Sequence, residues 1–594
     1  MRMRFHLLLF MAFSTLTLIM LFPLIFKLSI CIPGFFSTDE PYGLLWRFWW
    51  WGNVFLKCVP ANITNTIAYP SGVVFDISFT SPIWFYMSTW LSVVLGYIPA
   101  YNLEIILSFI LSGVFTYYFV KYITKNNYSA FLSAVIFSFC PYHFIKSWQH
   151  LGLAQIQWMP LFVFMLLKLN EKRNIKYTIL LTISFILVAN FDYYYAYFMF
   201  LASILFMVYI FLRERSKSIA LIKLLILAFV CALLFILPGI FSILMMFFSH
   251  SVEKTIVIKG YVRPFEDLFS QSARPLSYFL PATVHPVFGK FTEQFIGSSL
   301  YGISFTEHTL YLGWVPMILA FVAVRRWRRD RKVQGQSPSG TVPSESFYIG
   351  FFIFLTILAW LFSQPPWWKI GTIKIFMPSY FMYKILPMFR AYCRFGIVLM
   401  LAVAVLAGFG LKFILERFKS YKSRISITVL ACGLVLFEFW NWPPYKVIDV
   451  SKVPAVYYWL EGQHKDVIIA EYPLDINGPN EMYKFYQTVH EKRMINGTIP
   501  GTEANRTAKT LANLSQKQTT AKLKEWGVSY VLVHKDGYVR VGLVEDKQEF
   551  EKIPQNTDLK LIKRFSAQEC PDKDIMCVSK TGPIDVYEVI ANGK

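Results

Sequence analysis

Charged residues are scarce in this chain of 594 residues: Asp, Glu, Lys and Arg make up 16% of it, whereas hydrophobic residues make up 55%. A water-soluble domain normally carries about 25% charged residues, and one soluble core rarely grows beyond about 250–300 residues. The composition therefore excludes a single large soluble domain and predicts a protein that crosses a membrane several times.

Acidic residues are especially few, with 36 Asp and Glu against 58 Lys and Arg, which gives a net charge of +22. Such an excess can indicate nucleic-acid binding. Here the basic residues recur in short clusters between apolar segments, such as Arg325–Lys332, instead of gathering in one domain. This distribution is typical of the cytoplasmic loops of a membrane protein. We therefore expect no nucleic-acid partner.

The eight cysteines form neither a CxxC pair nor a spacing typical of zinc sites. Cys570 and Cys577 lie close together in a polar segment. They would form a disulfide if that segment faces an oxidising compartment, and otherwise remain two free thiols. The sequence leaves both alternatives open.

Long apolar segments supply the topology, because about 20 apolar residues span a bilayer. The first follows Arg2 and Arg4, is longer than the apolar core of a signal peptide and lacks a convincing cleavage site, so we expect a retained helix with a cytoplasmic N-terminus. The segment 83–98 is interrupted by proline and glycine and has no basic flank, so we expect a re-entrant or surface-lying helix. With that assignment, every dense basic cluster falls on one side of the membrane.

The predicted fold is therefore an all-α membrane bundle of about eleven spans, since helices satisfy their own backbone hydrogen bonds in lipid. The spans are residues 7–28, 101–122, 128–142, 151–169, 177–190, 193–212, 221–248, 309–324, 347–362, 395–415 and 425–440. Residues 1–444 form this transmembrane domain, with a large first external loop at 31–82.

The composition changes after residue 444, where charged residues become dense and short β-branched runs appear at 467–470, 528–533 and 585–589. Segments with helical patterns, 516–526 and 544–551, alternate with these predicted strands. Residues 445–594 are thus expected to form a small α/β domain. The topology places it outside the cytoplasm, on a plasma or inner membrane.

The same topology places a set of ionisable residues at the outer membrane surface, where such groups are costly and often functional. We predict a catalytic role for the first member and substrate binding for the others. The set is Asp39, Glu40, His143, His150, Asp192, Glu307, His308, Lys374, Arg390 and Arg394.

Asp39 is a candidate general base, because burial beside aromatic residues raises the pKa of a carboxyl group toward the working range. Its position alone equally allows a helix-capping or loop-solvating role. The tryptophan-rich segment 46–51 that follows is typical of an aromatic belt at the membrane surface, on which a sugar ring could also stack.

Arg390 and Arg394 are four residues apart before an apolar span, which predicts two guanidinium groups on one helix face. Planar guanidinium donors match phosphate oxygens. The pair is equally compatible with ordinary snorkelling to lipid headgroups. His143, His150 and Glu307 are weak candidates for a metal site because they lack tight spacing. No metal is predicted firmly, and a divalent cation is a further candidate cofactor.

These residues resemble those of the GT-C membrane glycosyltransferases, including protein O-mannosyltransferases and lipid-A sugar transferases. The resemblance lies in Asp39-Glu40 of the first external loop, the interrupted apolar helix after Ser81-Pro82 and the basic end of the next span. Further segments resemble uncharacterised bacterial GT-C-like proteins, namely residues 150–161, 307–313, 389–395 and 471–474.

The resemblance implies a polyprenyl-phosphate or pyrophosphate sugar donor, an extracytoplasmic glycan, lipid or protein acceptor, and inversion at the anomeric carbon. Asp39 matches the catalytic acid of the family's first loop. The second-loop position that is often acidic in the mannosyltransferases is His143 or His150 here. The sequence lacks a WWDYG motif, which argues against transfer of a whole glycan to asparagine.

The alternative is a non-catalytic scaffold, or a flippase, in the assembly of cell-envelope glycans. A flippase is expected to show repeated halves and a polar path through the bilayer interior. The sequence shows neither, because its polar residues collect at one membrane face.

Overall fold

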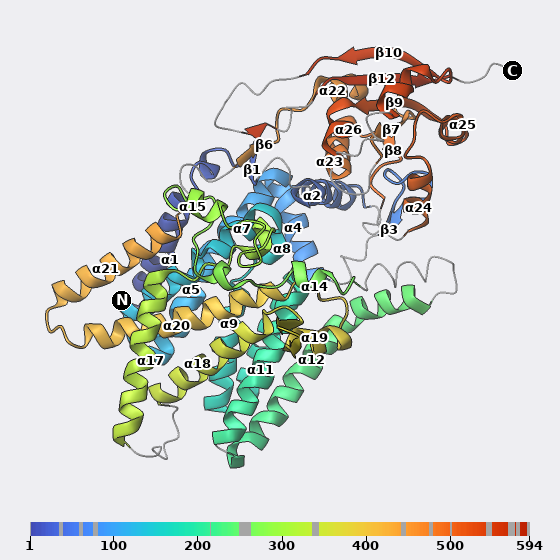
Figure 1. Cartoon of the computed structure of the whole chain (residues 1–594). Coiled ribbons are helices and arrows are strands. Elements are labelled where there is room, and N and C mark those ends of the chain that lie inside the picture. Colours follow the sequence, from blue (N-terminus) through green and yellow to red (C-terminus); the bar gives the residue numbers. More distant parts are fainter. Residues whose placement is uncertain are drawn as a thin grey trace.

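The computed structural model describes residues 2–34, 40–58, 63–74, 81–213, 215–248, 263–334, 344–440, 447–474, 479–498, 502–541, 549–567, 576–577 and 582–590. It shows a helical bundle with a smaller α/β domain at one end (Figure 1). The predicted fold class is confirmed. Asp39 and Cys570 lie outside these residues, so the structure tests neither the role of Asp39 nor the disulfide.

Each of the eleven predicted spans corresponds to helical segments of the bundle. Their bounds are α1 (Arg2–Met20), α5 (Tyr97–Thr124), α6 (Asn127–Ser138) with α7 (Pro141–Gln149), α8 (Leu151–Ala154) with α9 (Trp158–Lys172), α10 (Ile175–Phe191), α11 (Tyr193–Arg213), α12 (Arg215–Phe248), α17 (Trp314–Gln334), α18 (Glu345–Phe362), α20 (Gly396–Leu415) and α21 (Tyr421–Glu438).

Within the ranges that the structure describes, seven stretches of helix are long and apolar enough to cross a membrane, so the chain is an integral membrane protein. They correspond to α1, α5, α6 with α7, α11, α12, α18 and η3 with α20. The remaining four predicted spans, in α9, α10, α17 and α21, are shorter or carry more charge. The count of eleven stays a prediction.

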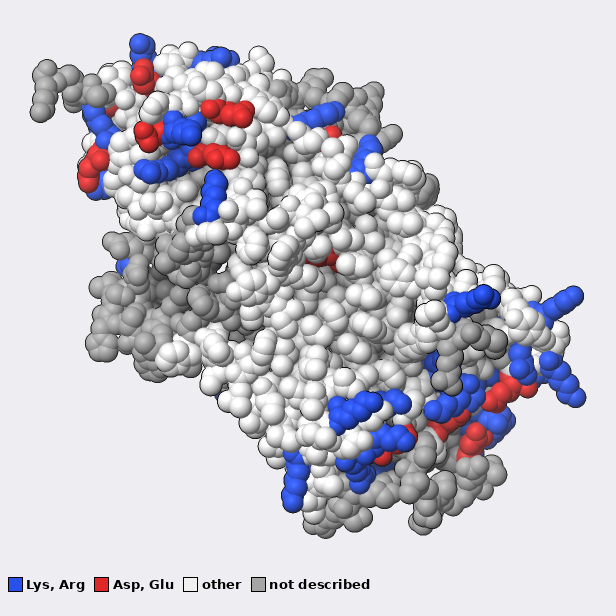
Figure 2. Space-filling model, turned by 180° about the vertical axis from the view of Figure 1, so that it is seen from behind, with Lys and Arg blue, Asp and Glu red and all other residues white. Residues whose placement is uncertain are grey.

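The basic helix ends gather at one end of the bundle, as the topology requires. Side-chain contacts join the helix termini that meet there, namely Phe5–Tyr117, Tyr122–Lys168, Tyr128–Tyr421, Lys412–Glu345, Ser346–Trp327 and Phe347–Tyr209. We call this the basic end. Figure 2 shows Lys and Arg gathered there, separated from the α/β domain by a surface with few charges.

The first loop, residues 31–82, contains a helix that the sequence did not predict, α2 (Glu40–Lys57). Beyond it, β2 (Ile63–Thr64) pairs with β3 (Val73–Val74). Helix α2 packs against α4 (Pro82–Leu95), α5 and α23 (Pro479–His490). Trp46 and Trp51 are fully buried, and Trp46 Nε1 donates to Gln487 Oε1 at 2.8 Å. The interpretation as a surface belt is therefore wrong for these two residues.

Between the helices, short elements build the loops at the end opposite the basic end. They are η1 (Leu24–Phe26), α14 (Asp267–Ser270), η2 (Pro275–Tyr278), α15 (Gly289–Glu293), α16 (Phe305–His308), the hairpin β4 (Trp367–Ile370) and β5 (Ile373–Phe376), α19 (Pro378–Ile385) and η3 (Tyr392–Phe395).

The α/β domain contains a five-stranded sheet in the order β10 (Leu559–Phe565), β12 (Ile584–Val589), β9 (Val528–His534), β7 (Ile468–Tyr472) and β8 (Arg493–Met494). Strand β7 runs parallel to β8 and β9, and β12 runs antiparallel to β9 and β10. The accompanying helices are α22 (Ala455–Glu461), α23, α24 (Glu503–Thr510), α25 (Lys517–Glu525), α26 (Lys535–Val541) and η4 (Ile553–Gln555). The three predicted strands and the helix at 516–526 are confirmed, whereas 544–551 lies largely outside the described residues.

A second, three-stranded sheet joins distant parts of the chain. Strand β6 (Val447–Asp449) lies between β1 (Cys31–Pro33) of the first loop and β11 (Met576–Cys577). Because β1 and α2 both contact segments beyond residue 444, the first loop and the α/β domain share one packed interface.

Candidate active site

A buried carboxylate, Glu307 of α16, lies between cations from two other elements. Its Oε1 is 2.6 Å from Arg394 Nη2 of η3 and 3.0 Å from Lys146 Nζ of α7, and its Oε2 accepts from Arg394 Nε at 3.1 Å. The Cys393 thiol donates to the same Oε2 at 3.2 Å. We call these four side chains the Glu307 cluster.

Glu307 is ionised in this environment. Burial alone would raise the pKa of its carboxyl group, but Arg394 and Lys146 outweigh burial and hold the pKa well below the usual range. The backbone fixes the side chain as well, because Ser304 caps α16 and its hydroxyl accepts from the Glu307 N–H at 3.2 Å. The carboxylate is thus an immobile negative charge that orients two cations.

The cluster carries more positive than negative charge, with Lys146 and Arg394 against Glu307. The Lys146 side chain is 0% exposed. Its ammonium lies 3.0 Å from Glu307 Oε1, and apart from this carboxylate it has no hydrogen-bond partner among the residues that the structure describes. A buried ammonium with unused N–H donors is expensive unless an anion or a hydroxyl meets it. The cluster is therefore suited to hold an anionic group.

Asp192 lies beside the cluster, at the junction of α10 and α11. Its Oδ1 accepts from the Tyr195 N–H at 3.1 Å and so caps α11. Burial raises the pKa of the Asp192 carboxyl group to about 6, although Arg394 and His150 act in the opposite direction. The same two residues lower the pKa of Glu307. Asp192, His150, Glu307 and Arg394 are thus within electrostatic reach of one another.

Glu40 connects the first loop to this group. It begins α2 and forms an ion pair with His150 Nδ1, at the junction of α7 and α8. Both side chains are partly exposed, at 49% and 26%. Asp39 immediately precedes Glu40 in the chain. The predicted base is therefore covalently attached to a residue that contacts the site.

Arg390 and Arg394 do not form the predicted pair on one helix face. Arg394 lies in η3 and α20 begins only at Gly396, so the spacing of four residues does not place both arginines on a helix. Arg390 Nη1 binds Asp267 Oδ2 at 2.5 Å, whereas Arg394 binds Glu307. Tyr194 connects them, because its hydroxyl accepts from the Arg390 N–H at 3.1 Å and its ring lies 4.5 Å below the Arg394 guanidinium.

Two predicted histidines belong to the packed interior and not to the cluster. His143 stacks on Phe109 at 3.7 Å, and its ring nitrogens lie 2.9 Å from Ser108 Oγ and 2.7 Å from the Ser138 carbonyl oxygen. His308 Nε2 lies 3.0 Å from the Ser272 carbonyl oxygen. These contacts favour a structural role for both imidazoles, by positioning loops around the site.

Lys374 also lies apart from the Glu307 cluster. It occupies the exposed strand β5, where its ammonium lies 4.7 Å from the centre of the Trp367 ring. No described group of three His, Cys, Asp or Glu side chains could hold a metal ion. Glu307 is already bound by two cations and His143 uses both nitrogens, so the weak metal set of His143, His150 and Glu307 does not fit a metal.

Sequence reasoning missed Lys146, Cys393 and Asp267. A signal for Lys146 was present, because it is a basic residue inside an apolar helical stretch that runs from 127 to 149. Asp267 gave no such signal, since it lies in a polar loop whose path depends on tertiary packing.

Comparison with known proteins gives a relationship through structure alone. No protein-family model matches the sequence, and no curated protein matches it. The oligosaccharyltransferase AglB from Archaeoglobus fulgidus, in complex with an inhibitory peptide and a dolichol-phosphate, aligns with a TM-score of 0.51 and 10% identity over 90% of this chain and 70% of that chain. Its apo form gives 0.52 and 9% identity over 96% and 75%.

The chain has the GT-C fold. ArnT from Cupriavidus metallidurans bound to undecaprenyl phosphate also aligns, with 10% identity over 98% of both chains, but its TM-score of 0.42 is too low to support an argument. At identities of about 10%, the structural alignment shows a shared fold, and a shared fold does not determine which reaction a protein catalyses.

Proposed function

We propose that this protein is an inverting glycosyltransferase that moves a sugar from a polyprenyl-phosphate or pyrophosphate donor to an extracytoplasmic glycan, lipid or protein acceptor. The observation that carries the proposal is the Glu307 cluster, a buried and net positive site at the end of the GT-C fold nearest the first external loop. The basic end then faces the cytoplasm with the N-terminus, and the α/β domain lies outside.

The cluster supports a phosphate-bearing donor. Lys146 has unused N–H donors, and Arg394 is held rigidly by Glu307 and Tyr194. Fixed cations in a site that excludes water stabilise an anion without reorganising. The AglB structure contains a dolichol-phosphate, which is a ligand of the proposed chemical class.

The proposed reaction is a single displacement at the anomeric carbon. The oxygen of the acceptor hydroxyl forms the new glycosidic bond, and Asp39 accepts the proton of that hydroxyl. The bond from the anomeric carbon to the phosphate oxygen breaks, and its electron pair leaves with the lipid phosphate. Lys146 and Arg394 favour the transition state because negative charge increases on that oxygen as the bond breaks.

The first experiment tests the base. Purified protein in lipid nanodiscs is incubated with radiolabelled polyprenyl-phosphate sugars and an extracytoplasmic acceptor fraction, and transfer is counted. Asp39→Asn should lower the rate about 10²- to 10⁴-fold, the usual contribution of a general base. Asp466→Asn, which changes an exposed carboxylate of the α/β domain, is the matched control and should retain most activity. Undiminished transfer by a folded Asp39→Asn protein would remove Asp39 from the mechanism.

The second experiment tests the phosphate site without needing the correct sugar. Undecaprenyl phosphate serves as the probe, and its binding is measured by native mass spectrometry. Lys146→Met removes one charged hydrogen-bond donor, which should weaken binding about 10- to 100-fold. Lys374→Met, outside the cluster, should leave it unchanged. Equal binding by both variants would contradict the assignment of Lys146.

A further inference from the structure

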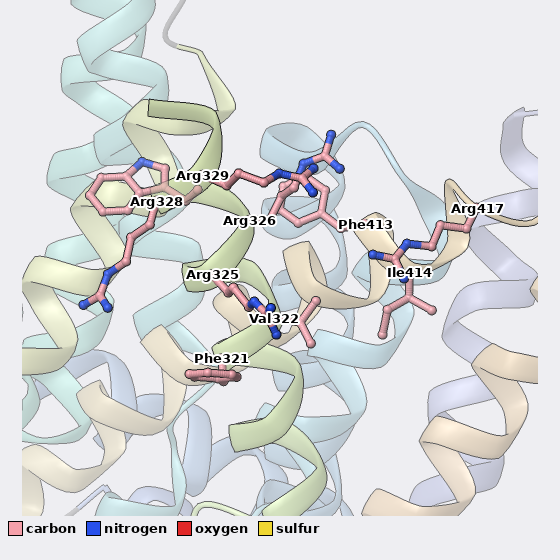
Figure 3. A pocket seen from close by; sticks show the side chains of 10 residues that line it. Phe321, Val322, Arg325, Arg326, Arg328, Arg329, Phe413, Ile414 and Arg417 are labelled. Carbon is pink, nitrogen blue, oxygen red and sulfur yellow. The ribbon is translucent and has the colours of Figure 1, made fainter. Parts of the chain in front are cut away.

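A basic pocket lies at the end of the bundle away from the Glu307 cluster. It is formed by residues 321–329 of α17, by the last turn of α20 and by Arg417 just beyond it, and it has a volume of about 920 Å³. Figure 3 shows arginine side chains around the space between the two helices. The lining residues are Phe321, Val322, Arg325, Arg326, Trp327, Arg328, Arg329, Phe413, Ile414 and Arg417.

The floor of the pocket is apolar and fixed by helix packing. A Cβ atom at Gly410 would lie 1.9 Å from the Leu319 backbone oxygen, so α17 and α20 touch at this level. About one turn further along, the two helices contribute Val322, Phe413 and Ile414 to the pocket. The pocket thus begins where this close backbone contact ends.

The walls of the pocket carry a large excess of positive charge. All five charged residues of its lining are arginines. Asp330 binds Arg326 at 2.8 Å and lies 3.6 Å from Arg329. Among the residues that the structure describes, Arg325 and Arg417 form no ion pair, and Figure 3 shows both extending toward the space between the helices. Arg328 points away from it.

Arginine walls above an apolar floor indicate a ligand that has both an anionic and an apolar part. We infer that the pocket holds the headgroup of an anionic phospholipid from the leaflet at the basic end. Guanidinium groups match phosphate oxygens, and basic pockets between membrane helices bind anionic lipid headgroups. The exposed side chain of Phe321, at 63%, and the apolar floor offer surface to the upper part of an acyl chain. A free phosphate would use the arginines and leave this apolar surface in water.

Two lipids and one double variant test the inference. Purified protein is reconstituted with dioleoyl phosphatidylglycerol or dioleoyl phosphatidylcholine, and lipid retention is measured by native mass spectrometry. Each basic residue near an anionic membrane surface strengthens the binding of anionic lipid. The double variant Arg325→Gln with Arg417→Gln loses two such residues, so its retention of phosphatidylglycerol should be about 30-fold weaker. Phosphatidylcholine retention should not change.

The matched control is Arg213→Gln with Lys176→Gln, which removes the same charge from exposed residues of the basic end that do not line the pocket. Retention of phosphatidylglycerol by the control, and its loss by Arg325→Gln with Arg417→Gln, would support the site. Equal losses in both proteins would show diffuse attraction and overturn it. Competition by millimolar glycerol 3-phosphate as effective as competition by the lipid would also overturn it.

A variant that keeps the charge separates binding from folding. Arg325→Lys with Arg417→Lys retains two cations but not the planar donor pairs, so its affinity should fall between wild type and the Gln variant. If the Gln variant fails to fold, the Lys variant alone tests the site. Phosphatidylglycerol retention equal to that of the wild type would contradict a guanidinium site. A loss of phosphatidylglycerol without a loss of phosphatidylcholine would support it.

Discussion

The two ends of the bundle hold their charges in opposite ways. At the end that carries the first loop, Glu307 and Lys146 are 5% and 0% exposed and contact each other. At the basic end, Arg325 and Arg417 are exposed and surrounded by other cations. Buried opposite charges fix a geometry, whereas exposed like charges orient a protein and attract anionic surfaces. The comparison distinguishes a buried charge group of fixed geometry from an exposed basic surface suited to the membrane.

The largest effect is expected from breaking the buried charge group. Glu307→Gln leaves Lys146 and Arg394 without a counter-ion in a buried site, which should cost about 3–5 kcal/mol of stability. The thermal unfolding midpoint in detergent measures this cost. Adding Lys146→Met to Glu307→Gln should recover part of the loss, because one uncompensated cation is removed. A midpoint like that of wild type for Glu307→Gln would show that the cluster is not closed to solvent.

A smaller and pH-dependent effect is expected at Asp192. Its pKa is raised from 3.8 to about 6, so the protonated form stabilises the fold and that contribution is lost as pH rises from about 4 through 6. Asp192→Asn keeps a side-chain oxygen to cap α11 and removes the charge. Since Asp192 is partly solvent accessible, we expect the variant to be more stable by about 1–2 kcal/mol at pH 7.5.

The check on Asp192 is the pair of unfolding midpoints at pH 4.5 and pH 7.5. The advantage of Asp192→Asn over wild type should shrink at the lower pH. An advantage of equal size at both pH values would rule out titration of this carboxyl group as its cause.

The basic end offers a matched ion pair with a smaller expected effect. Glu345 pairs with Lys412, and the glutamate side chain is 39% exposed. Glu345→Gln should therefore cost less than about 1 kcal/mol, as is usual for partly solvated pairs. Comparing its unfolding midpoint with that of Glu307→Gln measures the contrast directly. A cost as large as that of Glu307→Gln would abolish the distinction between the two ends.

The smallest effect is expected at Lys374, which the sequence placed among the substrate-binding residues. It lies on an exposed hairpin over Trp367 and contacts no member of the Glu307 cluster. Lys374→Ala should change stability by less than about 0.5 kcal/mol and leave sugar transfer unchanged. A marked rise in the KM for the donor in Lys374→Ala would show that this lysine does contribute to donor binding.

The helices of the bundle were predictable because their signals are local. Each apolar segment and its basic flank lie within one stretch of sequence, and the same holds for the alternating β-branched strands of the α/β domain. Helix α2 was missed for the opposite reason. Trp46 and Trp51 resemble a surface belt in the sequence, but Trp46 is buried beside Gln487 of α23, more than 400 residues later, and Trp51 packs against Phe85 of α4.

The sequence indicated several residues of the candidate site, but it did not indicate which of them contact one another. Charged residues near a membrane are costly and often functional, which is why Glu40, His150, Asp192, Glu307 and Arg394 were predicted. The structure brings these five side chains within electrostatic reach of one another. Sequence spacing could not show that Arg390 and Arg394 bind different acids. It also could not reveal that His143 is satisfied by two serines.

The sheet formed by β1, β6 and β11 imposes an order on biogenesis. Strand β1 precedes α2 and α5 in the chain, whereas its neighbour β6 and the next strand, Met576–Cys577, follow α21, the last helix of the bundle. Until these strands are made, the first loop lacks the partner of β1. Membrane insertion must therefore finish before this junction can close, and a nascent chain stalled after α21 would expose an unpaired strand to the quality-control machinery.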